Sequence, residues 1–87
     1  MKKYAVIREG SYWGYVYHDK EIALNSMAVG SLHGIREIVV EFEDKEDKYD
    51  DFITLGNLNK LPHRTIFDGG VFMALFGIKP KQEVNNE

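Results

Sequence analysis

Cysteine is absent from this chain of 87 residues, and proline occurs only twice. The lack of thiols excludes disulfides, thiolate zinc sites and cysteine nucleophiles, and it fits a cytoplasmic location. Long hydrophobic runs are missing as well. The longest one, Val71–Phe76, is far shorter than the ~20 residues that a transmembrane helix needs. We therefore expect a soluble cytoplasmic protein that does not enter a membrane.

An excess of positive charge is also lacking. The formal net charge is −3, whereas nucleic-acid-binding domains usually carry a net positive charge. The sequence thus argues against nucleic acid as the main partner. The negative charge is concentrated in residues 41–51, where seven carboxylates and two lysines give a local charge of −5. The carboxylates belong to Glu41, Glu43, Asp44, Glu46, Asp47, Asp50 and Asp51.

The length predicts one domain, because two halves of this chain would each be too small to bury a core. We assign residues 1–79 to this domain. Residues 80–87 contain a single apolar side chain, Val84, which predicts a disordered polar tail.

Two segments near the N-terminus predict a β-hairpin. Tyr4–Ile7 and Tyr12–His18 are rich in the β-branched and aromatic residues that strands favour, and a short glycine-containing link joins them. In Ile35–Glu43, the residues Ile38, Val40 and Phe42 face one way, while Glu37, Glu41 and Glu43 face the other way beside Ile35 and Val39. This alternation predicts a strand with one buried face and one solvated face.

Further strands are expected at Phe52–Leu55, followed by a turn at Gly56-Asn57, and at Thr65–Phe67. A helix over 47–60 is the alternative for the first of these. Asp44–Lys48 reads as a solvated turn, because burying so many like charges would be very unfavourable. The predicted fold is α+β, with a small, mainly antiparallel sheet made of the hairpin and two or three further strands, and one or two short helices.

The sequence leaves helix and strand open for residues 20–33 and 68–77, and it favours helices in both. Asp19 is placed to cap a helix that begins at about Lys20 and stops at Gly34. The alternative is a strand at Glu21–Leu24, with the helix beginning after it. Asp68 similarly either caps a helix or forms part of a hairpin turn.

The alternating polar residues of the acidic segment invite comparison with a calcium-binding loop, but the pattern fails. Lys48 occupies a position where an oxygen ligand is needed, and Tyr49 and Leu55 stand where the loop requires glycine and glutamate. We predict neither a metal site nor a cofactor. The seven carboxylates instead suggest a surface that binds a basic region of a protein partner.

A second candidate binding surface consists of aromatic residues. Trp13, Tyr15 and Tyr17 alternate along one predicted strand and therefore share one face, near Arg8 of the preceding strand. Such a face can belong to the core, bind a protein partner, or stack on the bases of single-stranded nucleic acid.

The most apolar stretch lies near the C-terminus. A helix that is apolar all round has to be covered by the rest of the fold or by another chain. We therefore predict self-association into a homodimer through Phe72, Met73 and Phe76.

No set of catalytic residues stands out. His18, His33 and His63 are not spaced to act together along one element. The best hypothesis is therefore a non-catalytic protein-binding or regulatory module, such as the inhibitors that small mobile genetic elements encode, acting through the acidic and aromatic surfaces. The alternatives are a protein that binds single-stranded nucleic acid through Trp13, Tyr15 and Tyr17 with help from Lys2, Lys3 and Lys20, and a small enzyme or enzyme subunit.

Overall fold

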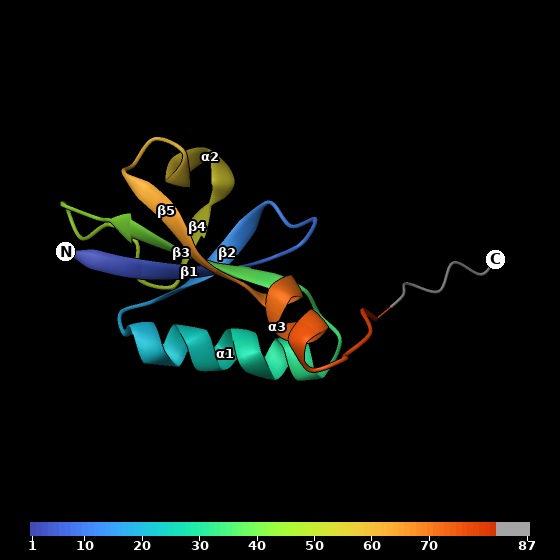
Figure 1. Ribbon diagram of the computed structural model, residues 1–87. Coiled ribbons are helices and arrows are strands. Elements are labelled where there is room, and N and C mark those ends of the chain that lie inside the picture. The colour runs from blue at the N-terminus through green and yellow to red at the C-terminus, as the bar shows by residue number, and fades with distance from the viewer. Residues whose placement is uncertain (82–87) are drawn as a thin grey trace.

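The computed structural model describes residues 1–81 of the chain. Five strands form one antiparallel sheet in the order β4-β2-β1-β3-β5, with α1 and α3 against one face and α2 against the other (Figure 1). The predicted α+β fold is confirmed. The elements are β1 (Lys2–Arg8), β2 (Trp13–Tyr17), α1 (Lys20–Leu32), β3 (Glu37–Glu43), β4 (Phe52–Thr54), α2 (Leu55–Leu58), β5 (His63–Asp68) and α3 (Gly69–Leu75).

The predicted hairpin is present as β1 and β2. Tyr4 pairs with Tyr17 and Ile7 with Gly14. The turn between the strands uses Gly10 at a φ of 84°, a conformation that glycine adopts without a steric penalty.

Helix α1 follows the longer of the two predicted alternatives. The Asp19 side chain accepts hydrogen bonds from the backbone N–H groups of Glu21 and Ile22, and this caps the helix. Gly34, at a φ of 78°, ends it as expected. Helix α3 is likewise confirmed, because the Asp68 side chain accepts a hydrogen bond from the backbone N–H of Gly70.

The core lies on both faces of the sheet. On the side of α2 it comprises a group of apolar side chains from the strands and the short helix: Ala5, Ile7, Val16, Val40, Phe42, Ile53 and Leu58. On the opposite side, Val6 and Val39 pack against Ala23 and Met27 of α1. The prediction that one face of β3 would be solvated was therefore wrong, since α1 and α3 cover Val39 completely.

The segment after β4 also differs from the prediction. Gly56 and Asn57, expected in a turn, lie within the four-residue helix α2, which the Thr54 side chain caps through the backbone N–H of Asn57. This helix places Leu58 in the core.

The last described residues connect back to the fold. The backbone N–H of Lys81 donates a hydrogen bond to the carbonyl of Gly34 at the end of α1 (2.7 Å). Lys81, the second residue of the predicted polar tail 80–87, is thus attached to the fold, and residues 82–87 of that tail lie outside the described residues.

Candidate functional site

An aromatic cluster forms where β2 pairs with β4. The register places Tyr15 opposite Phe52, and Trp13 lies two residues from Tyr15 on the same face. The rings of Trp13 and Tyr15 meet edge to face with centroids 4.8 Å apart, and those of Trp13 and Phe52 do so at 6.1 Å. We use the term aromatic cluster for Trp13, Tyr15 and Phe52.

The aromatic cluster is open to solvent. Trp13, Tyr15 and Phe52 are 40%, 59% and 56% exposed. They share the face of the sheet on which α1 lies, but α1 covers mainly β1 and β3 and contacts β2 less. The corner formed by β2 and β4 is thus left uncovered.

The structure separates Tyr17 from this cluster. Tyr17 is half-buried against the core beneath α1, and its hydroxyl lies 3.1 Å from the hydroxyl of Ser26. Of the three aromatic residues expected to form one surface, only Trp13 and Tyr15 lie together. Phe52 is the third member of the cluster. The sequence could not indicate this, because the position of Phe52 depends on the pairing of β2 with a strand 35 or more residues further along the chain.

A hollow of about 160 Å³ opens beside the cluster. Its walls include Arg8 of β1, Trp13 and Tyr15 of β2, and Glu37 of β3. Arg8 pairs with Glu37 across the sheet, and its Nε lies 3.8 Å from Glu37 Oε2. Burial raises the pKa of the Glu37 carboxyl above its usual value, and the charge of Arg8 opposes this only in part.

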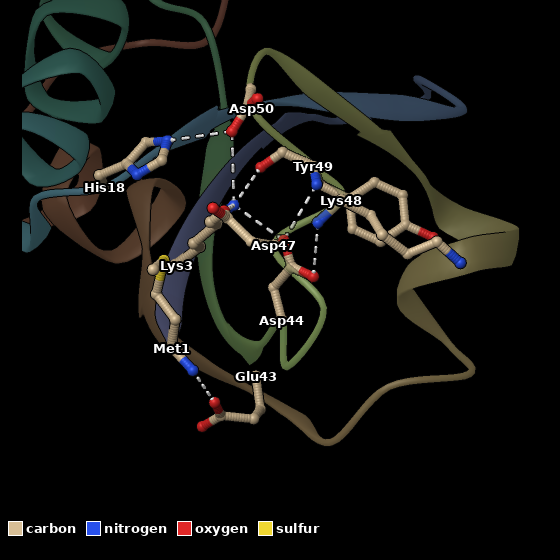
Figure 2. A network of polar contacts seen from close by, with 9 residues as sticks. All are labelled: Met1, Lys3, His18, Glu43, Asp44, Asp47, Lys48, Tyr49 and Asp50. Atoms are coloured by element: carbon tan, nitrogen blue, oxygen red, sulfur yellow. Dashed lines mark hydrogen bonds and ion pairs between the residues drawn. The ribbon is translucent and has the colours of Figure 1, made fainter.

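The acidic segment is organised around a buried lysine. The ammonium group of Lys3 lies 2.8 Å from Asp44 Oδ2, 2.6 Å from Asp47 Oδ1 and 2.7 Å from the carbonyl oxygen of Tyr49 (Figure 2). Asp50 approaches it to 3.6 Å. The side chain of Lys3 is fully buried, so it acts as an internal cation for these carboxylates.

Asp44 is the buried partner in this network. Burial by itself would raise the pKa of Asp44, but hydrogen bonds from Lys3 and from the backbone N–H groups of Tyr49 and Lys48 outweigh it and lower the pKa to about 2. Burial by itself would lower the pKa of Lys3, but hydrogen bonds to Asp44 and Asp47 and the charges of these two carboxylates outweigh it and raise the pKa.

Two expectations about this region were wrong. The segment from Asp44 to Lys48 is not a fully solvated turn, because Asp44 is only 2% exposed. Lys3, which the nucleic-acid alternative took to be available for binding, is buried and paired with carboxylates. The physical reason is the same for both, since each buried charge compensates the other.

The other acidic residues also have cationic neighbours. Glu41 pairs with Lys2 and Arg64, Glu43 with the N-terminal ammonium group of Met1, and Glu46 with Lys48. The chain terminus and three basic side chains that the fold brings to residues 41–51 reduce their local charge from −5 to −1. Asp51 is exposed and directly precedes Phe52.

The three histidines lie at different elements of the fold. His18 follows β2, His33 caps the C-terminus of α1, and His63 begins β5. His18 Nε2 lies 3.8 Å from Asp50 Oδ1, and both side chains are more than half exposed. Within residues 1–81, no three histidine, aspartate or glutamate side chains are grouped so that they could hold a metal ion.

The chain matches no protein-family model, no curated protein and no solved structure. The functional assignment therefore depends on the geometry of the chain itself.

The residues expected to mediate self-association have different environments. Met73 is 2% exposed and belongs to the interior, Phe72 is half-buried, and Phe76 is 68% exposed. Val71 and Leu75 are 54% and 76% exposed on the same short helix. None of the helices in residues 1–81 has the length and apolar character required to cross a membrane.

Proposed function

We propose that this protein is a non-catalytic protein-binding module and that the aromatic cluster is its binding surface. The observation that carries the proposal is the exposure of three large aromatic side chains at one uncovered corner of the sheet. Aromatic residues dominate the binding energy of protein interfaces, because they bury a large area with little loss of conformational freedom.

The surrounding charges favour a protein partner over a nucleic acid. Arg8, which lines the hollow beside Trp13, faces the carboxylate of Glu37. Lys2 and Lys3 are engaged with carboxylates of the acidic segment. Stacking surfaces for single strands usually combine aromatic rings with a positively charged groove, and these pairings work against such a groove here.

A partner with a basic surface fits the cluster best. Glu37 lines the hollow beside the aromatic rings and the exposed Asp51 directly precedes Phe52, while Arg8 is already paired. The acidic segment itself contributes less to binding than its composition suggests, since the fold compensates most of its charge. We place this binding in the cytoplasm, because a chain without cysteine has no disulfides that would require an oxidising compartment. Occlusion of a basic site on the partner would make the module an inhibitor.

Replacing Trp13 or Phe52 with alanine is expected to weaken partner binding strongly while leaving the fold intact. Truncation of an interface residue of this kind costs about 2 kcal/mol or more, which is about thirtyfold in affinity. Tyr12→Ala is the matched control, because Tyr12 is 83% exposed and lies outside the cluster. The measurement is affinity capture by tagged wild-type and variant proteins from lysate of the source cells, with and without nuclease, read by quantitative mass spectrometry. Titration of the purified partner follows.

Wild type and Tyr12→Ala should capture the same protein in stoichiometric amounts, and Trp13→Ala and Phe52→Ala should not. Equal capture by all four proteins would contradict the proposed surface. Capture that disappears on nuclease treatment would instead support the nucleic-acid alternative.

Self-association is a second proposal, supported by the apolar end of α3. Val71 and Leu75 of the seven-residue helix are more than half exposed, and so is Phe76, which caps its C-terminus. Exposed apolar groups of this kind often mark interfaces. We expect a homodimer at micromolar concentration that Leu75→Lys dissociates. Ile22→Lys, at an exposed apolar residue of α1, should leave it intact. Light scattering that shows only monomers across this range would exclude the dimer.

A further inference from the structure

The carboxylate of Glu37 is held in an unusual position for a charged group. Glu37 lies on β3 opposite Arg8, and its side chain is only 13% exposed. A β-carbon at Gly30 of α1 would collide with Glu37 Oε1. The absence of a side chain at Gly30 thus makes the space in which the carboxylate lies.

This arrangement reduces stability in two ways. A glycine in the interior of a helix is less favourable than alanine by about 1 kcal/mol. The partial burial of Glu37 disfavours its charged form and raises its pKa. Within residues 1–81, the carboxylate accepts no hydrogen bond, and its one cationic neighbour, Arg8, remains 3.8 Å away with a side chain that is 62% exposed. Groups that lower stability without structural compensation often serve binding.

The hollow next to Glu37 has the walls that a cation requires. Trp13 and Tyr15 line it together with Glu37. Aromatic rings attract cations through the negative charge of their faces, by about 0.5–2 kcal/mol depending on desolvation. The volume of about 160 Å³ accommodates several non-hydrogen atoms, because a single water needs only about 10–15 Å³ by the same measure.

We propose that this hollow binds one cationic side chain, an arginine or a lysine, of the protein partner, with Glu37 as the counter-charge and Trp13 and Tyr15 as the aromatic walls. We rest this inference on the proposed function, because the cluster that binds the partner also forms the hollow. In the free protein, the Arg8 side chain competes with the partner's cation for the Glu37 carboxylate. It rotates into solvent when the partner's cation enters the hollow. Exposure of most of the Arg8 side chain makes this exchange possible without unfolding.

The test uses small cations and needs no partner. N-acetyl-argininamide and N-acetyl-lysinamide are titrated into the ¹⁵N-labelled full chain, and the Trp13 Nε1–H resonance is followed. N-acetyl-citrullinamide has nearly the shape of the arginine compound but no charge. We expect saturable shifts with either or both cations in the millimolar range and none with citrulline. The stronger of the two cations identifies the side chain.

Three variants separate the proposed contacts from unspecific binding. Glu37→Gln keeps the shape of the side chain and is expected to weaken cation binding about tenfold, whereas the control Glu9→Gln, at an exposed carboxylate outside the hollow, should have no effect. Arg8→Ala removes the competitor and should strengthen binding. Gly30→Ala should raise the melting temperature, because the helix gains a better residue, while it displaces Glu37 and weakens binding.

Equal shifts with the citrulline compound, or unchanged affinity in Glu37→Gln, would overturn the proposal. Weaker binding in Arg8→Ala would overturn the role of Arg8 as competitor. The experiments distinguish the failure of one proposal from the failure of the other. If no cation binds but partner capture still depends on Trp13 and Phe52, the cation site is wrong and the binding surface stands. If cations bind and no partner is captured, the hollow binds cations and the proposed binding surface is wrong.

Discussion

Replacing Lys3 with methionine is expected to lower the free energy of unfolding by about 3–5 kcal/mol. Methionine fills most of the volume of the lysine side chain but leaves Asp44, which is 2% exposed, without its cation. The carboxylate then remains buried with only the backbone N–H groups of Lys48 and Tyr49 as partners. A domain of this size has about 5–10 kcal/mol of stability in total, so this single change removes a large part of it.

Lys2→Met is the matched control for this prediction. Lys2 is the preceding residue of the same strand, but its side chain is 61% exposed and lies 3.5 Å from Glu41. An exposed pair of this kind contributes less than about 1 kcal/mol. Urea denaturation followed by Trp13 fluorescence and by circular dichroism measures both variants. Equal stabilities of Lys3→Met and Lys2→Met would contradict the role of Lys3 as an internal cation.

A second substitution tests whether the loss in Lys3→Met comes from the unpaired charge. Adding Asp44→Asn to Lys3→Met removes that charge and should restore about 1–2 kcal/mol. A double variant that is less stable than Lys3→Met would point instead to the packing of the lysine side chain.

The Lys3 network changes how the acidic segment has to be probed. Reversing the charge of Asp44 or Asp47 would place a cation next to Lys3 and disrupt the fold, so lost binding in such a variant would say nothing about a partner. Glu46 and Asp51 are exposed, and neither lies in this network. These two positions are suitable for testing whether the acidic segment contributes to binding.

Local patterns in the sequence were sufficient to predict most of the elements. The hairpin depends on Gly10 and the strands beside it, and α1 depends on the Asp19 cap and the Gly34 stop. Each signal lies within a few residues of the element that it defines. For this reason the alternatives at 20–33 and 68–77 could be ranked in favour of helices, as the structure has them.

Properties that depend on the topology could not be predicted. The burial of Lys3 requires β1 to pair with β3, so that Lys3 lies opposite Phe42 and beside the loop that begins at Asp44. Similarly, Val39 is buried because α1 packs on that face of the sheet. Nothing in the neighbourhood of Lys3 or Val39 in the sequence indicates either contact.

In the candidate site, too, the local features could be predicted from the sequence and the long-range contacts could not. Alternation along one strand predicted that Trp13 and Tyr15 share a face, which the structure confirms. The contribution of Phe52 depends on the β2–β4 pairing, and that of Glu37 depends on the approach of Gly30 from α1. One signal was available in the sequence, because Gly30 is a poor residue for a helix interior and so indicated a close contact there.

The second large effect is expected in acid. The pKa of Asp44 is about 2 in the folded protein and 3.8 as the ordinary value for an aspartate. Because the folded pKa is the lower one, Asp44 stabilises the protein fully above pH 4, and this contribution disappears as the pH falls from about 4 to about 2. The loss amounts to about 2 kcal/mol. Lys3 adds no pH dependence in this range, because its raised pKa means that its stabilising contribution is fully present in acid and is lost only in strong base.

Comparing the wild type with Asp44→Asn isolates this contribution from those of other carboxylates. Glu41 and Asp68 also have lowered pKa values and lose stability in acid, whereas Glu37, with its raised pKa, acts in the opposite direction. All three are present in both proteins, so their effects cancel in the difference. We expect urea denaturation to show a stability difference between wild type and Asp44→Asn that shrinks by about 2 kcal/mol between pH 5 and pH 2. A difference that stays constant over this range would mean that Asp44 is not held as a charged group by Lys3.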